Sequence, residues 1–313
     1  MDLYSLNNKS LMGLDRLSFK SEKEIQSMIE NNTEELFGVK FIKSEITCND
    51  FRFDTLCFDE ENNSFVIIEY KNTKSSSIID QGYSYLSTML NNKSDFVLEY
   101  NENMNSHLRR DQIDWSQSRI IFISPSFTSY QKNSVNFRDI PFELWEIGKF
   151  SNQTIGLQKI FSNSKESIKG IEKGKNNLVS KVSKEVIKYD EESLVTKYSK
   201  EFLNIYYPLK EKVLEWDHTS FNVTKNYVSF IKNKSVIFYM NVKKNEFKID
   251  FIYRVDFSGN VKSKAIPFKF KDPENIFIPF ENKYKESFST SYTKNTDLDY
   301  LLYCLKQKYD SMK

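Results

Sequence analysis

A glutamate and a lysine stand at the end of an apolar run, where charged side chains are unexpected. Residues 65–74 read FVIIEYKNTK, so four apolar residues are followed at once by Glu69, Tyr70 and Lys71. Such a run predicts a strand buried in a sheet, and burying an uncompensated charge is costly. Because residues i and i+2 of a strand share a face, Glu69 and Lys71 point the same way and Tyr70 points the opposite way. The two charges therefore need a chemical explanation.

A second carboxylate lies on the strand before. The segment 51–58, FRFDTLCF, is a strand candidate, and the short polar turn after it indicates a hairpin with the apolar run. Regular alternation places Phe53 on one face of this strand and Asp54 with Leu56 on the other. The hairpin then brings Asp54 to the same end of the sheet as Glu69.

These three residues predict metal-assisted hydrolysis. Two carboxylates held together repel each other, and one of them takes up a proton unless a cation lies between them. Carboxylate oxygens and water are the ligands that Mg²⁺ prefers, and a lysine beside a metal-bound water orients or deprotonates it. A phosphodiester is the favoured substrate. The alternative is that Glu69 and Lys71 form a solvent-facing ion pair, which would stabilise the fold by only ~0–1 kcal/mol.

The surrounding elements are predicted from hydrophobic periodicity. Residues 21–37 form a helix that Ser21 caps, with Glu24 three residues later in a capping-box pattern, and Gly38 ends it. The further elements expected before residue 160 are strands at 39–45, 51–58 and 64–70, a helix at 78–90, and strands at 119–127 and 141–150. This order predicts an α/β fold in which helices flank a mixed sheet.

The composition changes after residue 160. Between 163 and 188 there are 7 lysines against 3 glutamates and few large apolar residues. We interpret 161–191 as a linker, a solvated tether rather than a phosphate-binding arm. Beyond it, 192–313 is predicted to be a smaller α+β domain with helices at 193–216 and 297–312 and strands at 221–231, 235–242 and 246–257. The first domain then spans 1–160.

Bulk properties limit the classes of protein. At 313 residues the chain suits two domains, and its net charge of +2 neither favours nor excludes an acidic partner. Cys48, Cys57 and Cys304 lack metal or disulfide spacing, which predicts free thiols in a reducing compartment. The first residues, MDLYSLNNKS, do not resemble a signal peptide, and no run of 18 apolar residues occurs. We expect a cytoplasmic protein with no membrane partner.

The charged strand end resembles a known motif. Asp54, followed after fourteen residues by Glu69-Tyr70-Lys71, is similar to the pattern of the PD-(D/E)XK nuclease superfamily, with Phe53 in place of the proline. Gln81 and Tyr85 on the next helix resemble the Q-X3-Y element of RecB-like and archaeal mismatch-endonuclease-like members. The resemblance covers roughly residues 21–150 and implies a restriction-endonuclease-like fold.

The resemblance also implies roles for particular residues. Asp54, Glu69 and the backbone carbonyl of Tyr70 would bind Mg²⁺ or Mn²⁺. Lys71 would position the attacking water, and Gln81 would support the site or contact the nucleic-acid backbone. In this family a glutamate of the first helix often helps to hold the metal.

Two glutamates of the first helix are candidates for that last ligand. We expect Glu24 to serve, with Glu30 as the alternative. For each of them a solvent-facing helix charge is the competing interpretation.

The sequence thus supports two hypotheses from different classes. The first is a Mg²⁺-dependent nuclease that acts on nucleic acid, with DNA favoured over RNA. The second is a nucleic-acid-binding or regulatory protein on a nuclease-like fold that cuts nothing. The sequence leaves the oligomeric state open, although related nucleases often form homodimers that cut two strands.

Overall fold

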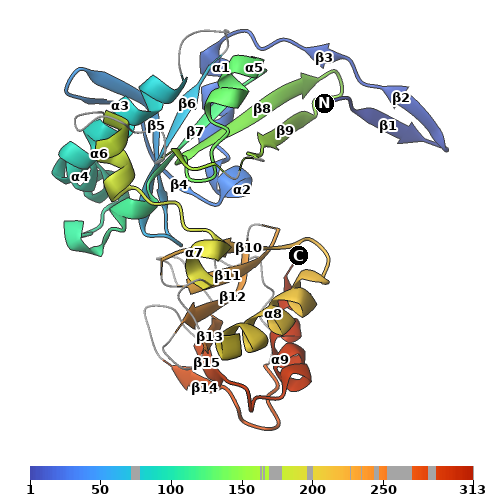
Figure 1. The fold of residues 1–313 in the computed structure, drawn as a ribbon. Coiled ribbons are helices and arrows are strands. Elements are labelled where there is room, and N and C mark those ends of the chain that lie inside the picture. Colours follow the sequence, from blue (N-terminus) through green and yellow to red (C-terminus); the bar gives the residue numbers. More distant parts are fainter. Residues whose placement is uncertain are drawn as a thin grey trace. The chain divides into compact units, whose positions relative to one another are not determined.

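Two compact units make up the protein, Met1–Lys188 and Tyr189–Lys313 (Figure 1). The computed structural model describes residues 1–71, 78–162, 164, 166–168, 178–195, 200–225, 227–233, 235–242, 247–251, 270–280 and 287–312. Part of the predicted linker, residues 169–177, and most of the strand predicted at 246–257 lie outside these ranges. Each unit is described by itself.

The first unit is built on a mixed seven-stranded sheet. Its strands are β3 (Arg16–Leu17), β4 (Lys40–Cys48), β5 (Phe51–Asp59), β6 (Ser64–Tyr70), β7 (Arg119–Ser124), β8 (Phe142–Phe150) and β9 (Ile155–Ile160). They follow the order β3-β8-β7-β6-β5-β4, and β9 also pairs with β8. β7 runs parallel to β6 and to β8, whereas the other neighbours are antiparallel. The central strands are therefore covered on both faces, which explains the unbroken apolar runs of β6 and β7.

Helices cover both faces of this sheet (Figure 1). They are α1 (Glu22–Glu30), α2 (Thr33–Phe37), α3 (Ile78–Asn91), α4 (Lys93–Met104), α5 (Ser129–Ser134) and α6 (Leu178–Glu185), with 3-10 turns at Arg110–Gln112 and Trp115–Gln117. One core lies under α1 and holds Val66 and Ile68 of β6. The other lies under α3 and α4 and holds Phe65 and Ile67. Consecutive residues of β6 thus enter opposite cores.

The first helix begins and stops close to where the sequence predicts. Ser21 caps α1 by accepting the backbone N–H of Glu24, and Gly38 ends α2 at φ 68°, a left-handed conformation that favours glycine. The helix predicted at 21–37 is nevertheless divided at Asn31 and Asn32 into α1 and α2. Asparagine side chains compete for nearby backbone groups, and both of these bond to carbonyls one turn back.

The residues predicted as a linker differ most from expectation. Ile168, Val182 and Val186 are buried in the core under α3 and α4. The described part of 161–191 up to Lys188 therefore belongs to the first unit and is not a solvated tether. Val182 and Val186 lie four residues apart and therefore on one side of the α6 segment, and α6 packs against α3.

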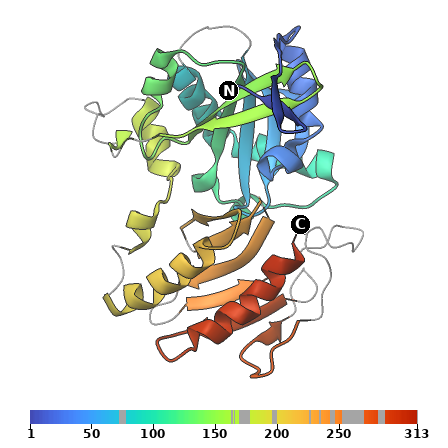
Figure 2. The same cartoon turned by 90° about the vertical axis from the view of Figure 1, so that its right-hand side faces the viewer.

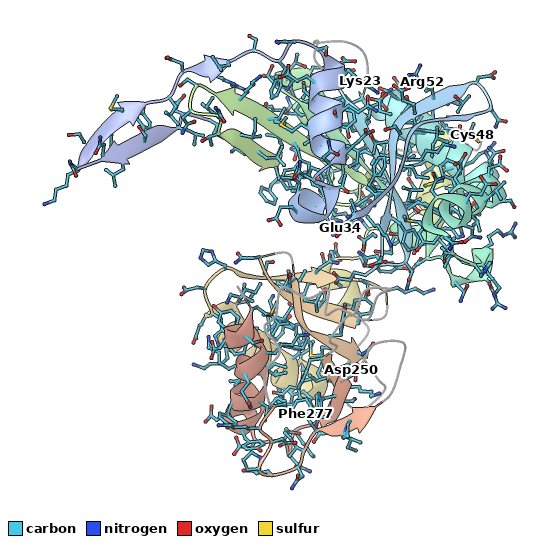
Figure 3. All side chains as sticks on the ribbon, turned by 180° about the vertical axis from the view of Figure 1, so that it is seen from behind. Lys23, Glu34, Cys48, Arg52, Asp250 and Phe277 are labelled. Atoms are coloured by element: carbon cyan, nitrogen blue, oxygen red, sulfur yellow. The ribbon has the colours of Figure 1, made fainter. Side chains whose placement is uncertain are left out.

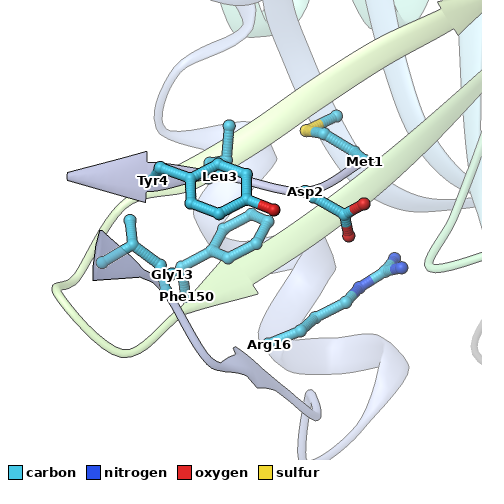
Figure 4. A pocket seen from close by; sticks show the side chains of 8 residues that line it. Met1, Asp2, Leu3, Tyr4, Gly13, Arg16 and Phe150 are labelled. Atoms are coloured by element: carbon cyan, nitrogen blue, oxygen red, sulfur yellow. The ribbon is translucent and has the colours of Figure 1, made fainter. Parts of the chain in front are cut away.

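A short two-stranded hairpin precedes the sheet. Its strands are β1 (Tyr4–Asn7) and β2 (Ser10–Gly13). Beside it lies a pocket of about 210 Å³ whose lining includes Met1, Arg16 and Phe150 (Figure 4). The residues predicted to do chemistry do not line this pocket.

The second unit is a six-stranded antiparallel sheet with two long helices on one face (Figure 2). Its elements are α7 (Glu191–Val195), α8 (Lys200–Leu214), β10 (Thr219–Val223), β11 (Tyr227–Lys232), β12 (Ser235–Val242), β13 (Phe247–Phe251), β14 (Ile278–Phe280), β15 (Ser287–Tyr292) and α9 (Leu298–Ser311). The strand order is β10-β11-β12-β13-β15-β14. The single strand predicted at 221–231 is two strands, since Thr224 turns the chain by accepting the N–H of Tyr227. In the described part of the chain, no helix is long and apolar enough to cross a membrane.

Candidate active site

The end of β6 carries the first half of the candidate site. Phe65–Ile68 are fully buried, and Glu69 is only 3% exposed. Lys71 Nζ donates a hydrogen bond to Glu69 Oε1 over 2.8 Å. The Tyr70 ring lies in the opposite core, with Ile25 of α1. The prediction that Glu69 and Lys71 share a face is confirmed, and that face is the one that α3 covers.

Helix α3 places two further polar groups against the same carboxylate oxygen. Gln81 Nε2 donates to Glu69 Oε1 over 2.6 Å, and the Tyr85 hydroxyl lies 3.3 Å from that oxygen. The Tyr85 ring packs edge-on against Phe53, with 4.7 Å between ring centroids, which fixes the hydroxyl in place. Glu69 Oε2, by contrast, is buried and has no hydrogen-bond partner among the described residues. One oxygen of Glu69 is therefore held by donors, and the other is left available.

Strand β5 is irregular beside this carboxylate. Phe53 and Leu56 both enter the core under α3. The Thr55 hydroxyl faces α1, where it lies 2.6 Å from Glu30 Oε1. The regular alternation predicted for 51–58, with Phe53 and Leu56 on opposite faces, is therefore wrong. The register is the same on both sides of the break, because one residue leaves the ladder on each strand, Asp54 on β5 and Glu45 on β4.

Asp54 occupies the irregular position and reaches β6 with its side chain. Asp54 Oδ2 accepts the backbone N–H of Tyr70 over 3.0 Å. Because the N–H and C=O of one strand residue point to the same side, the Tyr70 carbonyl also faces the Asp54 side of β6. The side chains of Asp54 and Glu69 interact with each other as well. The two carboxylates and the Tyr70 carbonyl thus gather at one end of the sheet.

Both carboxylates hold a proton more strongly than usual. Burial is the largest cause for Glu69 and the charge of Asp54 adds to it, so the pKa of Glu69 rises to about 7 in spite of Lys71. Burial also raises the pKa of Asp54, although the Tyr70 N–H and the charge of Lys71 act in the opposite direction. A cation beside the pair would remove this penalty.

The arrangement fits a hard divalent cation. Glu69 Oε2 offers an unpaired buried oxygen, Asp54 a second carboxylate and Tyr70 a carbonyl. Mg²⁺ typically takes one or two carboxylates and keeps several waters. Over the ranges that the structure describes, no cluster of three or more His, Cys, Asp or Glu suits a metal. Water would therefore complete the coordination.

Comparison with known proteins places the chain in a family without defining its activity. No protein-family model matches the sequence. A protein of Haemophilus influenzae (strain ATCC 51907 / DSM 11121 / KW20 / Rd), described as "Uncharacterized protein", is 39% identical over 238 residues, which are 75% of this chain and 78% of that protein. The chain belongs to the same family as this protein.

Three solved structures are similar to part of the chain. A repair endonuclease from Pyrococcus abyssi is 20% identical over 42% of this chain and 49% of its own, with a TM-score of 0.25. An EndoMS–dsDNA complex is 20% identical over 45% and 49%, with a TM-score of 0.23. Pyrococcus furiosus SfsA in complex with Ca²⁺ is 12% identical over 44% and 63%, with a TM-score of 0.24. The chain thus spans about half the length of the first two proteins and 63% of the third.

The two acids predicted as ligands on the first helix, Glu24 and Glu30, are bonded to other groups and not to Asp54 or Glu69. Glu24 accepts Lys149 Nζ with one oxygen and the backbone N–H of Lys20 with the other, each over 2.6 Å. Glu30 Oε1 accepts Gln26 Nε2 and the Thr55 hydroxyl. The structure therefore does not support Glu24, or Glu30 as its alternative, as a metal ligand.

A third acid of α1, Glu22, influences Asp54 through its charge, and the sequence interpretation did not include it. Burial is the main cause of the raised pKa of Asp54, and the negative charge of Glu22 also raises it. Glu22, Gln26 and Glu30 recur every four residues and form one stripe of the helix, whereas Glu24 lies two residues, or about 200°, away from Glu22. In the sequence, this four-residue spacing from Glu30 could have indicated that Glu22 and Gln26 lie on the same side of the helix.

Proposed function

We propose that this protein is a metal-dependent nuclease that hydrolyses phosphodiester bonds of nucleic acid, with DNA the favoured substrate. The observation that carries the proposal is the asymmetric environment of Glu69. Its Oε1 receives Lys71 and Gln81, while its buried Oε2 has no hydrogen-bond partner in the described part of the chain. A buried oxygen of this kind is costly unless a ligand satisfies it. The resemblance of Asp54 and Glu69-Tyr70-Lys71 to the PD-(D/E)XK motif supports the same assignment.

The residues have distinct tasks in this proposal. Asp54, Glu69 and the Tyr70 carbonyl would hold Mg²⁺ or Mn²⁺. When bound, the cation supplies a Lewis acid that lowers the pKa of water and stabilises negative charge on a phosphate. Gln81 keeps the Glu69 carboxylate in one orientation through its 2.6 Å hydrogen bond. That fixed orientation leaves Oε2 without a hydrogen-bond partner in the described part of the chain.

Lys71 is the candidate for handling the attacking water. Its side chain is 17% exposed, so its ammonium group lies between the buried Glu69 and solvent. From there it can donate a hydrogen bond to a water that approaches the phosphate, and it can compensate the charge that develops during attack. Gln81 and Tyr85 already occupy the protein side of Glu69 Oε1, so the water is expected on the Lys71 side.

The test is a cleavage assay on single-stranded, double-stranded and branched DNA and on RNA, with Mg²⁺, Mn²⁺ or EDTA. Glu69→Gln keeps the shape of the side chain and removes its charge. Glu99→Gln is the matched control. Glu99 lies on α4 and forms an ion pair with Lys43 of β4, so it contacts neither Asp54 nor Glu69 in that pairing. We expect metal-dependent cutting that E69Q loses by at least ~100-fold and E99Q retains.

Two outcomes would contradict the proposal. Cutting that persists in E69Q or in EDTA would remove Glu69 or the metal from the mechanism. If the wild type binds nucleic acid but cuts none of the substrates, the alternative applies: a nucleic-acid-binding or regulatory protein on the same fold.

A further inference from the structure

Asp54 differs from the other residues of β5 in its backbone pairing. Between Phe51 and Asp59, all of which the structure describes, every residue except Asp54 has a cross-strand partner in β4 or β6. The β5–β6 ladder ends at Thr55, and the β4 ladder passes from Thr55 directly to Phe53. A backbone carbonyl that leaves a ladder in a protein interior needs another hydrogen-bond donor.

Gln26 of α1 supplies that donor. Its Nε2 donates to the backbone carbonyl of Asp54 over 3.0 Å. The same nitrogen donates to Glu30 Oε1 over 2.9 Å, and Gln26 Oε1 accepts Lys23 Nζ over 3.3 Å. Gln26 is only 5% exposed, so these contacts replace those it would make with water. A buried amide with both ends engaged has one orientation, which directs its second N–H at Asp54.

The network extends to the strand that carries the candidate metal ligands. Glu30 Oε1 also accepts the Thr55 hydroxyl over 2.6 Å, and that hydroxyl lies 3.1 Å from the hydroxyl of Tyr70. The chain Gln26–Glu30–Thr55–Tyr70 therefore links α1, β5 and β6. The last residue of this chain, Tyr70, is also the one whose backbone N–H donates to the Asp54 carboxylate.

The other side of β5 is held as well. Glu45 of β4 has φ 54°, which is unusual for a residue other than glycine, and it lies at the gap in the ladder opposite Asp54. Its carboxylate pairs with Lys23 Nζ over 2.9 Å and with Arg52 over 2.8 Å. Figure 3 shows Lys23 and Arg52 on their adjacent elements. The irregular backbone at Asp54 is thus maintained from both sides, and Lys23 contacts both Gln26 and Glu45.

We propose that Gln26 is a positioning residue that holds the Asp54 backbone out of the ladder, so that the Asp54 carboxylate faces Glu69 and the Tyr70 backbone. Glu30 acts through Gln26 by orienting its amide and does not bind metal. This inference rests on the proposed function, in which Asp54 binds the metal and its position therefore matters. Outer contacts of this kind typically change metal affinity roughly 10–100-fold when they are removed.

The first experiment compares Gln26→Met with Gln131→Met. Gln131 is the matched control because it is also 5% exposed and hydrogen-bonded, and it lies on α5, where its side chain pairs with Thr128. Binding of Mn²⁺ alone is measured by isothermal titration calorimetry, and Tm is measured for both variants. We expect Q26M to bind Mn²⁺ about 10-fold more weakly or worse. Q131M should lower Tm to a similar degree and bind Mn²⁺ as the wild type does. Wild-type affinity in Q26M, or equal loss in both variants, would overturn the proposal.

Glu30→Gln separates positioning from metal binding. A glutamine at position 30 still offers an oxygen to Gln26 and to Thr55, so we expect Mn²⁺ affinity within about 3-fold of the wild type. A loss as large as that of Q26M would mean that the charge of Glu30 matters directly, and the assigned role of Glu30 would be wrong.

A metal-independent measurement keeps this inference distinct from the nuclease proposal. Exchange of the Tyr70 amide hydrogen is followed by NMR in protein labelled with ¹⁵N-tyrosine, without metal. Because Gln26 holds the acceptor of that N–H in place, Q26M should exchange it at least 10-fold faster, and Q131M should not. If the wild type binds no Mn²⁺, the proposed function fails, yet the exchange still decides the role of Gln26. Unchanged exchange in Q26M would overturn that role whether or not the protein binds metal.

Discussion

The carboxylate of Asp54 accepts the backbone N–H of Tyr70 over 3.0 Å, where a regular sheet would have a backbone carbonyl. Through this contact a side chain of β5 replaces one rung of the ladder. The strands separate at that point, and Asp54 remains beside Glu69. The candidate site therefore lies where the β5–β6 ladder ends, and the Asp54 carboxylate accepts the hydrogen bond that would continue that ladder.

Replacing Lys71 should separate catalysis from metal binding. In Lys71→Met the apolar stem is kept and the ammonium is lost, so we expect cleavage at saturating Mn²⁺ to fall by about 10²–10⁴-fold. Mn²⁺ affinity should stay equal or rise, because the cation that pairs with Glu69 at 2.8 Å is gone. Single-turnover cleavage rates and calorimetry measure the two effects. If Lys71→Met cuts at the wild-type rate at saturating Mn²⁺, Lys71 has no role in the chemical step and the prediction is wrong.

The hydroxyl and the ring of Tyr85 should have separable effects. Tyr85→Phe keeps the packing on Phe53 and removes the hydroxyl that lies 3.3 Å from Glu69 Oε1. We expect cleavage to fall roughly 10-fold, with a change in unfolding free energy of about 1 kcal/mol. Tyr85→Ala, which also removes the ring, should cost about 3–5 kcal/mol. Urea unfolding together with cleavage rates tests this, and equal stability of the two variants would contradict it.

Gly82 allows α3 to approach the sheet, and a methyl group there should displace the helix. A Cβ added at Gly82 would lie 2.5 Å from the ring of Phe142 on β8. We expect Gly82→Ala to destabilise the protein by about 1–3 kcal/mol and to slow cleavage, since Gln81 and Tyr85 move with the helix. Phe142→Leu in the same chain makes room, so the double variant should recover part of both losses. If the effects of Gly82→Ala and Phe142→Leu simply add in the double variant, the contact between positions 82 and 142 is not the cause of the losses.

Stability should fall in acid because of an ion network at the other end of the sheet. Burial opposes ionisation of Glu143, but Lys159 and Arg119 outweigh it and lower the pKa of Glu143 to about 2. The pKa of Asp59 is also lowered, because Arg119 and Asn62 outweigh its burial. A pKa below the unfolded value of about 4.3 means that the unfolded chain binds more protons in acid. The stabilisation is complete above that value and is lost as the pH falls towards 2.

The measurement is urea unfolding between pH 7 and pH 2.5 for the wild type and Glu143→Gln. We expect the wild type to lose on the order of 2 kcal/mol more than E143Q over this range, since the variant lacks one of the titrating groups. Parallel pH profiles for the two proteins would show that Glu143 does not contribute.

Local sequence determined the features that depend on neighbours along the chain. The apolar run before Glu69 predicts a buried strand, and the two-residue period places Lys71 on the same face, as their 2.8 Å contact confirms. The start of α1 at Ser21 and the end of α2 at Gly38 follow for the same local reason. Helix α4 was missed because few of its apolar side chains are buried, chiefly Phe96 and Tyr100.

Tertiary structure decided which face of each element meets the site. On α1, Ile25 and Ile29 are fully buried, and their packing against the sheet turns Gln26 towards Asp54 and Glu24 towards Lys149. On β5, the break in the ladder at Asp54 interrupts an alternation that the sequence by itself predicts to be regular. Both outcomes depend on contacts between segments distant in the chain. The sequence determined that two carboxylates and a lysine would meet at a strand end, and only the packing of α1 and α3 on the sheet decided which other residues hold them there.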